Sequence, residues 1–329
     1  MDSDLSKQPE LVVQLAKTIE PKSKVAILLA TYNGSKYIRE FLDSLVAQTE
    51  TDFKLIVRDD GSTDDTLEII HSYSSKIRIA FIEATVRLGP ANSFFELLMH
   101  VDDTFDFYFF ADQDDFWQSS KIGRAVDELS SKKEQIALYC SRLEYVDENL
   151  VHIKYSRIPK VIALENALVE NIAIGCTLAL TRPARQLVIE SPPCPIIIKN
   201  WWFYHDWWIY IVIVTFGTVI YDKSPTIKYR QHDKNSVGAA TNIFQDLNRR
   251  VTRFVKNDSG IFGIATQANE FKRCFSWMLK EEQLDLLKNI IGGKASINKR
   301  LQLAFASSFI RQRALDTFIL RMLFLIGRF

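Results

Sequence analysis

Short runs of β-branched and aromatic residues alternate with helical patterns between residues 24 and 140. In the helical segments, apolar positions recur three and four residues apart, as in helices with one buried face. Strands that alternate with helices predict an α/β fold, a mostly parallel sheet with helices on both faces. The predicted strands are residues 25–30, 54–58, 77–82, 107–110 and 136–140.

Polar and turn-forming residues mark where the helices of this region begin. One helix follows Ser35, a predicted N-cap, another starts near Thr63, and Pro90 opens a third. After residue 140 the pattern is less regular. It predicts strands at 176–181 and 226–230 and a helix at 204–214.

The pattern divides the chain into three parts. Residues 1–22 form an N-terminal extension, residues 23–240 form the α/β domain, and residues 241–329 form a helical C-terminal region. The C-terminal region holds 15 Lys or Arg against 7 Asp or Glu, whereas the whole chain has a net charge of +1. Such a basic and apolar region predicts peripheral contact with an anionic membrane, or helices that pack on the preceding domain or mediate a homodimer.

The composition excludes several classes of protein. Hydrophobic residues make up 47% and charged residues 25%, which excludes a disordered, collagen-like or coiled-coil chain. The balanced charge excludes a uniformly basic protein that coats nucleic acid, and no nucleic-acid partner is expected.

The cysteines and the apolar segments indicate the compartment. No two of the four cysteines form a C-x-x-C pair, so neither a zinc cluster nor a disulfide framework is indicated. The first residues contain no apolar segment of a signal peptide, and the most apolar run, residues 207–221, is too short to span a bilayer. We therefore expect a cytoplasmic protein, in part peripheral at the inner face of the plasma membrane.

Polar groups follow three of the predicted strands directly. They are Thr31-Tyr32-Asn33-Gly34, Asp59-Asp60-Gly61-Ser62 and Asp112-Gln113-Asp114-Asp115. In an open α/β sheet the ligand crevice lies beyond the carboxyl ends of the strands. Like charges in one crevice are costly unless a cation or a ligand rich in donors compensates them. For the second group, a plain turn followed by a helix N-cap is an equally good interpretation.

The Asp112-x-Asp114 pair is the sharpest of these signals, because it follows a strand that is predicted to be buried. Divalent cations such as Mg²⁺ take oxygen ligands, commonly one or two carboxylates together with substrate phosphates. A surface turn is the alternative interpretation, and it is weakened by the polar groups at the other two strand ends.

In their order along residues 23–240, these motifs resemble the inverting glycosyltransferases of family 2, which have the GT-A fold. The resemblance implies a nucleotide diphospho-sugar donor and Mg²⁺ or Mn²⁺. The nucleotide-binding residues that it implies are Thr31, Tyr32, Asn33, Asp60, Arg87 and Asp112. The metal ligands that it implies are Asp112, Asp114 and His232, although His232 also suits donation to a phosphate or an exposed loop.

Three longer motifs are similar to bacterial rhamnosyltransferases within that family. They are residues 111–117, 205–208 and 229–238. This similarity implies transfer of L-rhamnose from dTDP-rhamnose to a glycan or a lipid-linked glycan, in the synthesis of a surface polysaccharide such as O-antigen or capsule. Another hexosyl donor, such as a UDP-sugar, remains an alternative.

Asp206 is the candidate catalytic base, because it interrupts one of the most apolar stretches of the chain. Burial raises the pKa of a carboxylate towards values that suit a base, and a carboxylate can accept the proton of the acceptor hydroxyl. One base without an enzymic nucleophile predicts a single displacement that inverts C1. The alternative role of Asp206 is a helix N-cap or a hydrogen bond to a core amide.

The surroundings of Asp206 are aromatic. Trp201, Trp202, Trp207 and Trp208 predict a platform for the acceptor sugar or a plain hydrophobic core. The residue before the base is often Glu in the family, and here it is His205, which leaves the acceptor contacts open.

Two other classes of function compete with a transferase. Acidic strand ends beside a metal site also suit a phosphoacceptor signalling module, but the chain does not clearly offer its compact size or its lysine after a late strand. A catalytically silent sugar-nucleotide or glycan binder is the other alternative. The presence of Asp112, Asp114, Asp206 and His232 argues against it.

Overall fold

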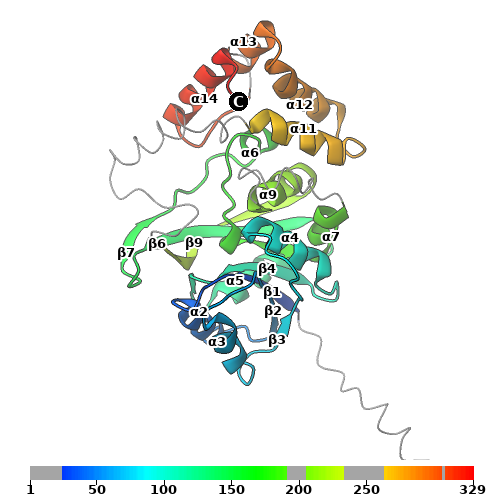
Figure 1. The fold of residues 1–329 in the computed structure, drawn as a ribbon. Helices are drawn as coiled ribbons and strands as arrows, with labels where there is room; N and C mark the ends of the chain where they lie inside the picture. Colours follow the sequence, from blue (N-terminus) through cyan, green and yellow to red (C-terminus); the bar gives the residue numbers. More distant parts are fainter. Residues whose placement is uncertain (1–23, 191–204, 233–262, 306–307) are drawn as a thin grey trace, which may run out of the picture.

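The computed structural model describes residues 24–190, 205–232, 263–305 and 308–329. Within these ranges one mixed sheet forms the centre of the molecule (Figure 1). Its strands follow the order β3-β2-β1-β4-β8-β6-β9-β5, and β7 pairs with β6 beside this path.

The first half of the sheet is parallel, as the alternating pattern predicts. β1 (Val25–Thr31) lies between β2 (Phe53–Asp59) and β4 (Phe107–Asp112), and β3 (Ile79–Phe81) pairs with β2. Val25 lies opposite both Phe53 and Phe107, so the three strands end at the same edge. This edge therefore receives the loops that carry the predicted site.

Helices cover both faces of the sheet and bury one hydrophobic core on each face. α2 (Ile38–Val46), α3 (Thr66–Ser72) and α5 (Lys121–Ser130) pack on one face. The other face is covered by α4 (Pro90–His100), α7 (Arg182–Glu190) and α9 (His205–Phe216).

The predicted N-cap of the first helix is wrong. α2 begins at Ile38 with Tyr37 as its N-cap, because the Gly34 carbonyl accepts the amides of both Tyr37 and Ile38 in a preceding turn. The Ser35 amide instead donates to Asp64 Oδ2 at 3.1 Å. Ser35 thus joins two loops of the site.

The second half of the sheet departs most from the sequence pattern. β8 (Ala179–Thr181) is antiparallel to β4 and to β6 (Ala137–Val146), and β6 is parallel to the long β9 (Thr218–Arg230). The start of the strand predicted at 176–181 is instead a 3₁₀ turn, Gly175–Thr177. β9 starts at Thr218, well before the predicted residue 226. The sequence analysis missed this first part of the strand, because Pro225 and a shift of register opposite Ser141 and Arg142 interrupt the strand pattern.

Two short strands were not predicted. β5 (Phe116–Trp117) pairs antiparallel with β9, and β7 (His152–Tyr155) pairs with the end of β6. β5 has only two residues, and every residue of β7 is exposed, so neither strand carries a buried pattern that the sequence could show.

The described C-terminal residues form helices that lie above α9 and α6 (Leu164–Ala167) in Figure 1. They are α11 (Ile264–Phe275), α12 (Glu281–Gly293), α13 (Ile297–Phe305) and α14 (Ala314–Ile326). The Trp208 and Phe271 ring centroids are 5.8 Å apart, and the Phe216 and Phe275 centroids are 5.3 Å apart. These rings join α9 to α11. The predicted boundary at residues 240 and 241 lies outside the described ranges.

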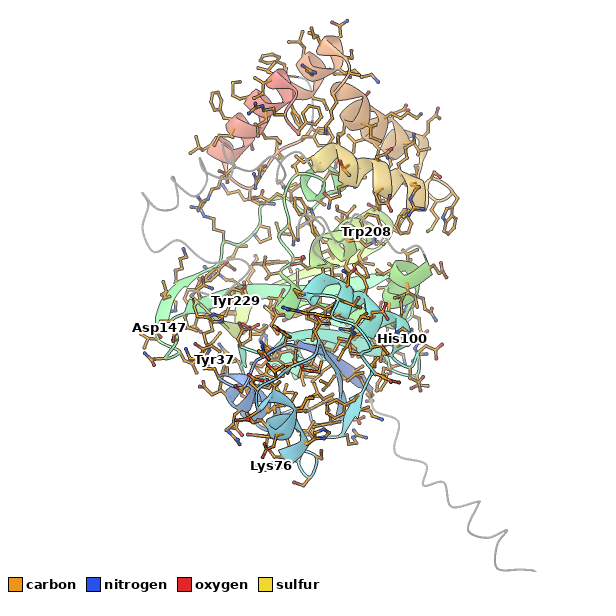
Figure 2. All side chains as sticks on the ribbon, viewed as in Figure 1. Tyr37, Lys76, His100, Asp147, Trp208 and Tyr229 are labelled. Atoms are coloured by element: carbon orange, nitrogen blue, oxygen red, sulfur yellow. The ribbon has the colours of Figure 1, made fainter. Side chains whose placement is uncertain are left out.

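Trp208 is part of the hydrophobic core and not of a platform for the acceptor. Its ring is fully buried and lies between the sheet and the C-terminal helices (Figure 2). Trp207 is partly buried, and its indole N–H donates to the Ala167 carbonyl at 2.6 Å. Trp201 and Trp202 lie outside the described residues. In the described part of the chain, the helices are too short or too polar to cross a membrane.

Candidate active site

The loops that follow β1 and β2 are bound to each other by side chains. The Asn33 amide donates to Ser62 Oγ at 2.9 Å, and Asn33 Oδ1 accepts the Thr63 amide at 2.9 Å. Thr31 Oγ1 donates to Asp59 Oδ1 at 2.8 Å. Thr31 and Asn33, two predicted nucleotide-binding residues, therefore also hold the two strand ends together.

Gln113 connects the loop after β4 to the loop after β1. Its Oε1 accepts the Tyr32 amide at 3.0 Å and its Nε2 donates to the Tyr32 carbonyl at 3.0 Å, so both ends of the amide are used. A Cβ atom on Gly34 would lie 2.3 Å from Gln113 Oε1, which no real contact allows. The sequence analysis did not assign a role to Gln113, because nothing in the pattern shows its distant partner.

The two carboxylates after β2 have separate roles. Asp59 accepts the amides of Gly61 and Ser62 at 3.1 and 2.7 Å, and so holds the turn. Asp60 is buried and accepts Arg58 Nη1 at 2.6 Å and the amides of Leu88 and Gly89 at 2.8 and 2.7 Å. The two amides anchor the loop that leads into α4 to the end of β2.

The pKa of Asp60 lies below its ordinary value. Burial alone would raise this pKa, but the hydrogen bonds from Arg58, Leu88 and Gly89 favour the charged form and outweigh it. Beside this loop, the Arg87 guanidinium lies 3.8 Å from the centre of the Tyr32 ring. The predicted nucleotide residues Tyr32 and Arg87 are thus in contact.

Asp112, Asp114 and Asp206 gather at the end of β4. Asp112 is the last residue of β4 and is partly exposed. Burial, together with the charges of Asp114 and Asp206, raises its pKa to about 7. The charges of the predicted base, Asp206, and of the predicted metal ligand Asp114 therefore act on the same carboxyl group. Along the chain, 91 residues lie between Asp114 and Asp206.

Asp206 lies in the first turn of α9 and is buried. Its Oδ2 accepts the Gly175 amide at 3.0 Å and its Oδ1 accepts the Trp207 amide at 2.7 Å. Burial raises its pKa to about 6, against the effect of these hydrogen bonds. The hydrogen bond to a core amide, which the sequence analysis gave as an alternative role of Asp206, is therefore present. Each carboxylate oxygen still has a lone pair for a further donor.

His232 is paired with Asp114 in this group. His232 Nε2 lies 2.7 Å from Asp114 Oδ2, and the His232 ring stacks on Tyr37 with the ring centroids 5.2 Å apart. Arg230 Nε donates to the Asp114 carbonyl at 3.0 Å, and the Arg230 guanidinium lies 4.5 Å from the centre of the Tyr37 ring. Arg230, fully buried, is a positioning residue that the sequence analysis did not identify.

Behind the motif lies a buried polar group. Oxygen atoms of Asp112 and Asp115 and the Cys176 sulfur lie within 4.8 Å of one another. Asp115 is buried next to Cys176, and the buried Lys121 Nζ has no hydrogen-bond partner in the described part of the chain. Burial raises the pKa of Asp115 well above its ordinary value and lowers that of Lys121 to about 8.

These residues fit a cation that prefers oxygen ligands. Burial, with the charges of Asp115 and Asp112 nearby, raises the pKa of the Cys176 thiol well above its ordinary value, so a thiolate is disfavoured. The remaining donors are carboxylates and the imidazole of His232, a set that suits Mg²⁺ or Mn²⁺. The charges of Asp114 and Asp206 help to raise the pKa of Asp112, and a bound cation would relieve this repulsion.

His205 is buried in the core against two aromatic rings. Its ring is 4.2 Å from the ring of Phe94 and 5.6 Å from that of Phe110, measured between centroids. Burial lowers its pKa to about 3, so the imidazole is neutral. A Cβ atom on Gly175 would lie 2.9 Å from His205 Nε2, so this glycine allows the close approach.

Comparison with known proteins identifies the class. The sequence model for glycosyl transferase family 2 matches residues 26–188. A dTDP-rhamnosyl transferase of Shigella flexneri, RfbG, is 33% identical over 228 residues, which are 64% of this chain and 74% of RfbG. An uncharacterized glycosyltransferase of Rickettsia typhi is 26% identical over 248 residues, 70% of this chain and 71% of the relative.

The fold agrees with that assignment. The crystal structure of Staphylococcus aureus TarS 1-349 in complex with UDP-GlcNAc superposes with a TM-score of 0.53 at 16% identity, over 93% of each chain. The fold is therefore that of GT-A glycosyltransferases. The chain belongs to glycosyl transferase family 2, whose members transfer sugars from nucleotide-sugar donors.

Gly34→Ala should weaken the connection between the first and third loops. The added methyl group displaces the Gln113 side chain, so both of its hydrogen bonds to Tyr32 are lost. We expect a loss of about 1–3 kcal/mol in the free energy of unfolding, measured by denaturant titration. Gly123→Ala is the matched control, because its Cβ would meet Thr49 at an ordinary 3.7 Å; it should stabilise α5 by about 0.5–1 kcal/mol. Equal stability of the two variants would show that Gln113 does not join the loops.

Asp112→Asn should stabilise the cation-free protein at pH 8. The pKa of Asp112 is raised from 3.8 to about 7 in the folded state, so the stability linked to its proton is present below about pH 4 and lost as the pH rises through about 7. The advantage of the variant in melting temperature should therefore shrink as the pH is lowered from 8 to 5 in the presence of EDTA. An advantage that does not change with pH would contradict the raised pKa.

Proposed function

We propose that the protein transfers a sugar from a nucleotide diphospho-sugar to a hydroxyl group of a glycan or a lipid-linked glycan, with inversion at C1 and with the help of Mg²⁺ or Mn²⁺. The observation that carries this proposal is the gathering of Asp112, Asp114 and Asp206 around the end of β4, with His232 on Asp114. The family assignment supports the same chemistry.

Asp206 is the proposed base. The acceptor hydroxyl gives its proton to a free lone pair of the Asp206 carboxylate as its oxygen forms a bond to C1. The bond between C1 and the diphosphate oxygen breaks at the same time, and the nucleoside diphosphate leaves. Two backbone amides hold the carboxylate in place, so it loses little freedom when the acceptor binds.

The other side chains bind and orient the donor. Asp112, Asp114 and His232 would hold the divalent cation, which neutralises the charge that develops on the leaving diphosphate. Arg230 fixes Asp114 by donating to the Asp114 backbone carbonyl, and Tyr37 fixes the ring of His232 by stacking on it. Tyr32, Arg87 and the loop anchored by Asp60 would enclose the nucleotide.

The proposed donor is dTDP-L-rhamnose, and the proposed process is the synthesis of a bacterial surface polysaccharide, an O-antigen or a capsule. The identity of 33% to a dTDP-rhamnosyl transferase supports this donor. Such acceptors are assembled on lipid carriers at the cytoplasmic face of the membrane, and we propose that this protein acts there.

Asp206→Asn should lower the rate of transfer by about 100-fold to 10,000-fold, because it removes the base. Asp206 accepts one backbone amide on each carboxylate oxygen, whereas Asn has a single oxygen, so the variant loses one of these hydrogen bonds. Its folding is therefore checked by the thermal stabilisation that the nucleotide diphosphate and Mn²⁺ give. That stabilisation should be nearly unchanged. Asp127→Asn on the exposed face of α5 is the matched control and should turn over normally. A variant of Asp206 with normal turnover would place the base elsewhere.

The donor is tested by thermal shift with dTDP and UDP, each with and without Mn²⁺. We expect dTDP to raise the melting temperature more than UDP, and the rise to require Mn²⁺ and Asp114. The Asp114→Asn variant is the control for the cation. A larger shift with UDP would identify a UDP-sugar donor. Stabilisation without turnover across a panel of donors and lipid-linked acceptors would indicate a silent binder.

A further inference from the structure

Helix α14 exposes a continuous apolar face. Leu315, Phe318, Met322 and Ile326 lie three or four residues apart, and 55%, 58%, 38% and 60% of their surface is exposed. The opposite face of the helix, with Leu320 and Phe324, is buried against the other C-terminal helices. We call the four exposed residues the α14 face.

The neighbouring helix α13 adds to this exposed apolar surface. It packs against α14, and it exposes Ile297, Leu301 and Phe305 at four-residue spacing. Single apolar residues on a surface are common, but two adjacent helices that each expose a row of them mark an interaction site.

The last 36 residues of the chain carry mainly positive charge. Residues 294–329 contain the cations Lys294, Lys299, Arg300, Arg311, Arg313, Arg321 and Arg328. The single acidic residue in this range is Asp316, and it is buried. A partner for this surface must therefore be apolar and negatively charged.

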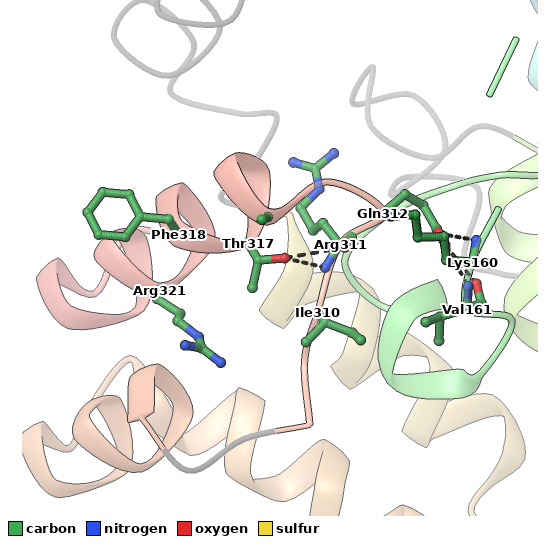
Figure 3. A pocket seen from close by; sticks show the side chains of 9 residues that line it. Lys160, Val161, Ile310, Arg311, Gln312, Thr317, Phe318 and Arg321 are labelled. Carbon is green, nitrogen blue, oxygen red and sulfur yellow. Dashed lines mark hydrogen bonds between the residues drawn. The ribbon is translucent and has the colours of Figure 1, made fainter. Parts of the chain in front are cut away.

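A hollow beside the α14 face is lined by three cations, two from the last 36 residues and one from the preceding domain. Lys160, Arg311 and Arg321 line it together with Phe318 (Figure 3). Both arginine side chains are partly exposed, and Arg311 Nη2 lies 3.6 Å from a carboxylate oxygen of Glu170. The exposed part of a guanidinium group can also donate to a phosphate group.

We infer that the α14 face lies in the surface of an anionic phospholipid bilayer. Phe318 and its apolar neighbours would enter the boundary between headgroups and acyl chains, and Lys160, Arg311 and Arg321 would contact lipid phosphates. A symmetric pairing of two copies through this face would instead bring the same cations against each other, which like-charge repulsion disfavours. The inference does not depend on the proposed sugar transfer, because it concerns a surface of the C-terminal helices.

The test is flotation of the full-length protein with vesicles at about 0.15 M salt. Wild type should float with vesicles that contain phosphatidylglycerol and phosphatidylcholine, and not with phosphatidylcholine alone. The triple variant Leu315→Ser, Phe318→Ser, Met322→Ser should lose at least about 10-fold in vesicle affinity, because three apolar side chains that would enter the bilayer are replaced by polar ones. Trp277→Ser, which removes an exposed aromatic ring on the same group of helices, is the matched control and should float like wild type.

The charged part of the surface has its own control pair. Arg321→Glu should weaken binding to the anionic vesicles, whereas Lys288→Glu, on the exposed side of α12, should change it little.

Sedimentation of wild type and the triple variant distinguishes contact with a bilayer from pairing with a second copy. A wild-type dimer that becomes a monomer in the variant would assign the face to a second copy and overturn the inference. Equal flotation of the triple variant and wild type would overturn it as well.

Discussion

The site depends on the concentration of negative charge at the carboxyl edge of the sheet. Asp112, Asp114 and Asp206 are close enough that repulsion and burial raise the pKa of Asp112 to about 7, and Asp115 is buried directly behind them. Buried charges of one sign destabilise the folded state unless a partner compensates them. Lys121 supplies part of that compensation from inside the core, and the rest is available to a cation and to the donors of a bound substrate. In the proposed function, the same repulsion that costs stability would provide affinity for the cation.

Keeping these carboxylates together requires a rigid frame, which long-range polar contacts supply. Gln113 holds the loop after β4 to the loop after β1, and Asn33 holds that loop to the turn after β2. Arg230 reaches from the end of β9 to the carbonyl of Asp114 and to Glu40 on α2. Each of these contacts gives hydrogen-bond partners to polar groups at the edge of the sheet. The frame therefore also offsets the cost of burying the polar groups of these loops.

The sequence predicted the parallel half of the sheet and the gathering of its polar ends, because β1, β2 and β4 are largely apolar runs that stop at polar or charged residues. It did not predict the extent of β9, whose pattern is broken at Pro225, nor the buried positions of Arg230 and Lys121. Charged residues are ordinarily exposed, so a pattern of apolar positions cannot show that one is buried. The metal, nucleotide and base assignments remain predictions about residues whose positions the structure now gives.

Helix α9 links the site to the C-terminal region. Asp206 lies in its first turn beside the carboxylates, and Trp208, two residues later, packs on Phe271 of α11. Asp206, the proposed base, and the contact with the C-terminal helices are thus less than one helical turn apart, and α9 cannot tilt without moving both. If α14 lies on a bilayer, the bilayer fixes the orientation of this group of helices, and through α9 it fixes the orientation of Asp206. An acceptor carried by a membrane lipid would then meet Asp206 at a defined height above the bilayer, which a freely diffusing catalytic domain could not ensure.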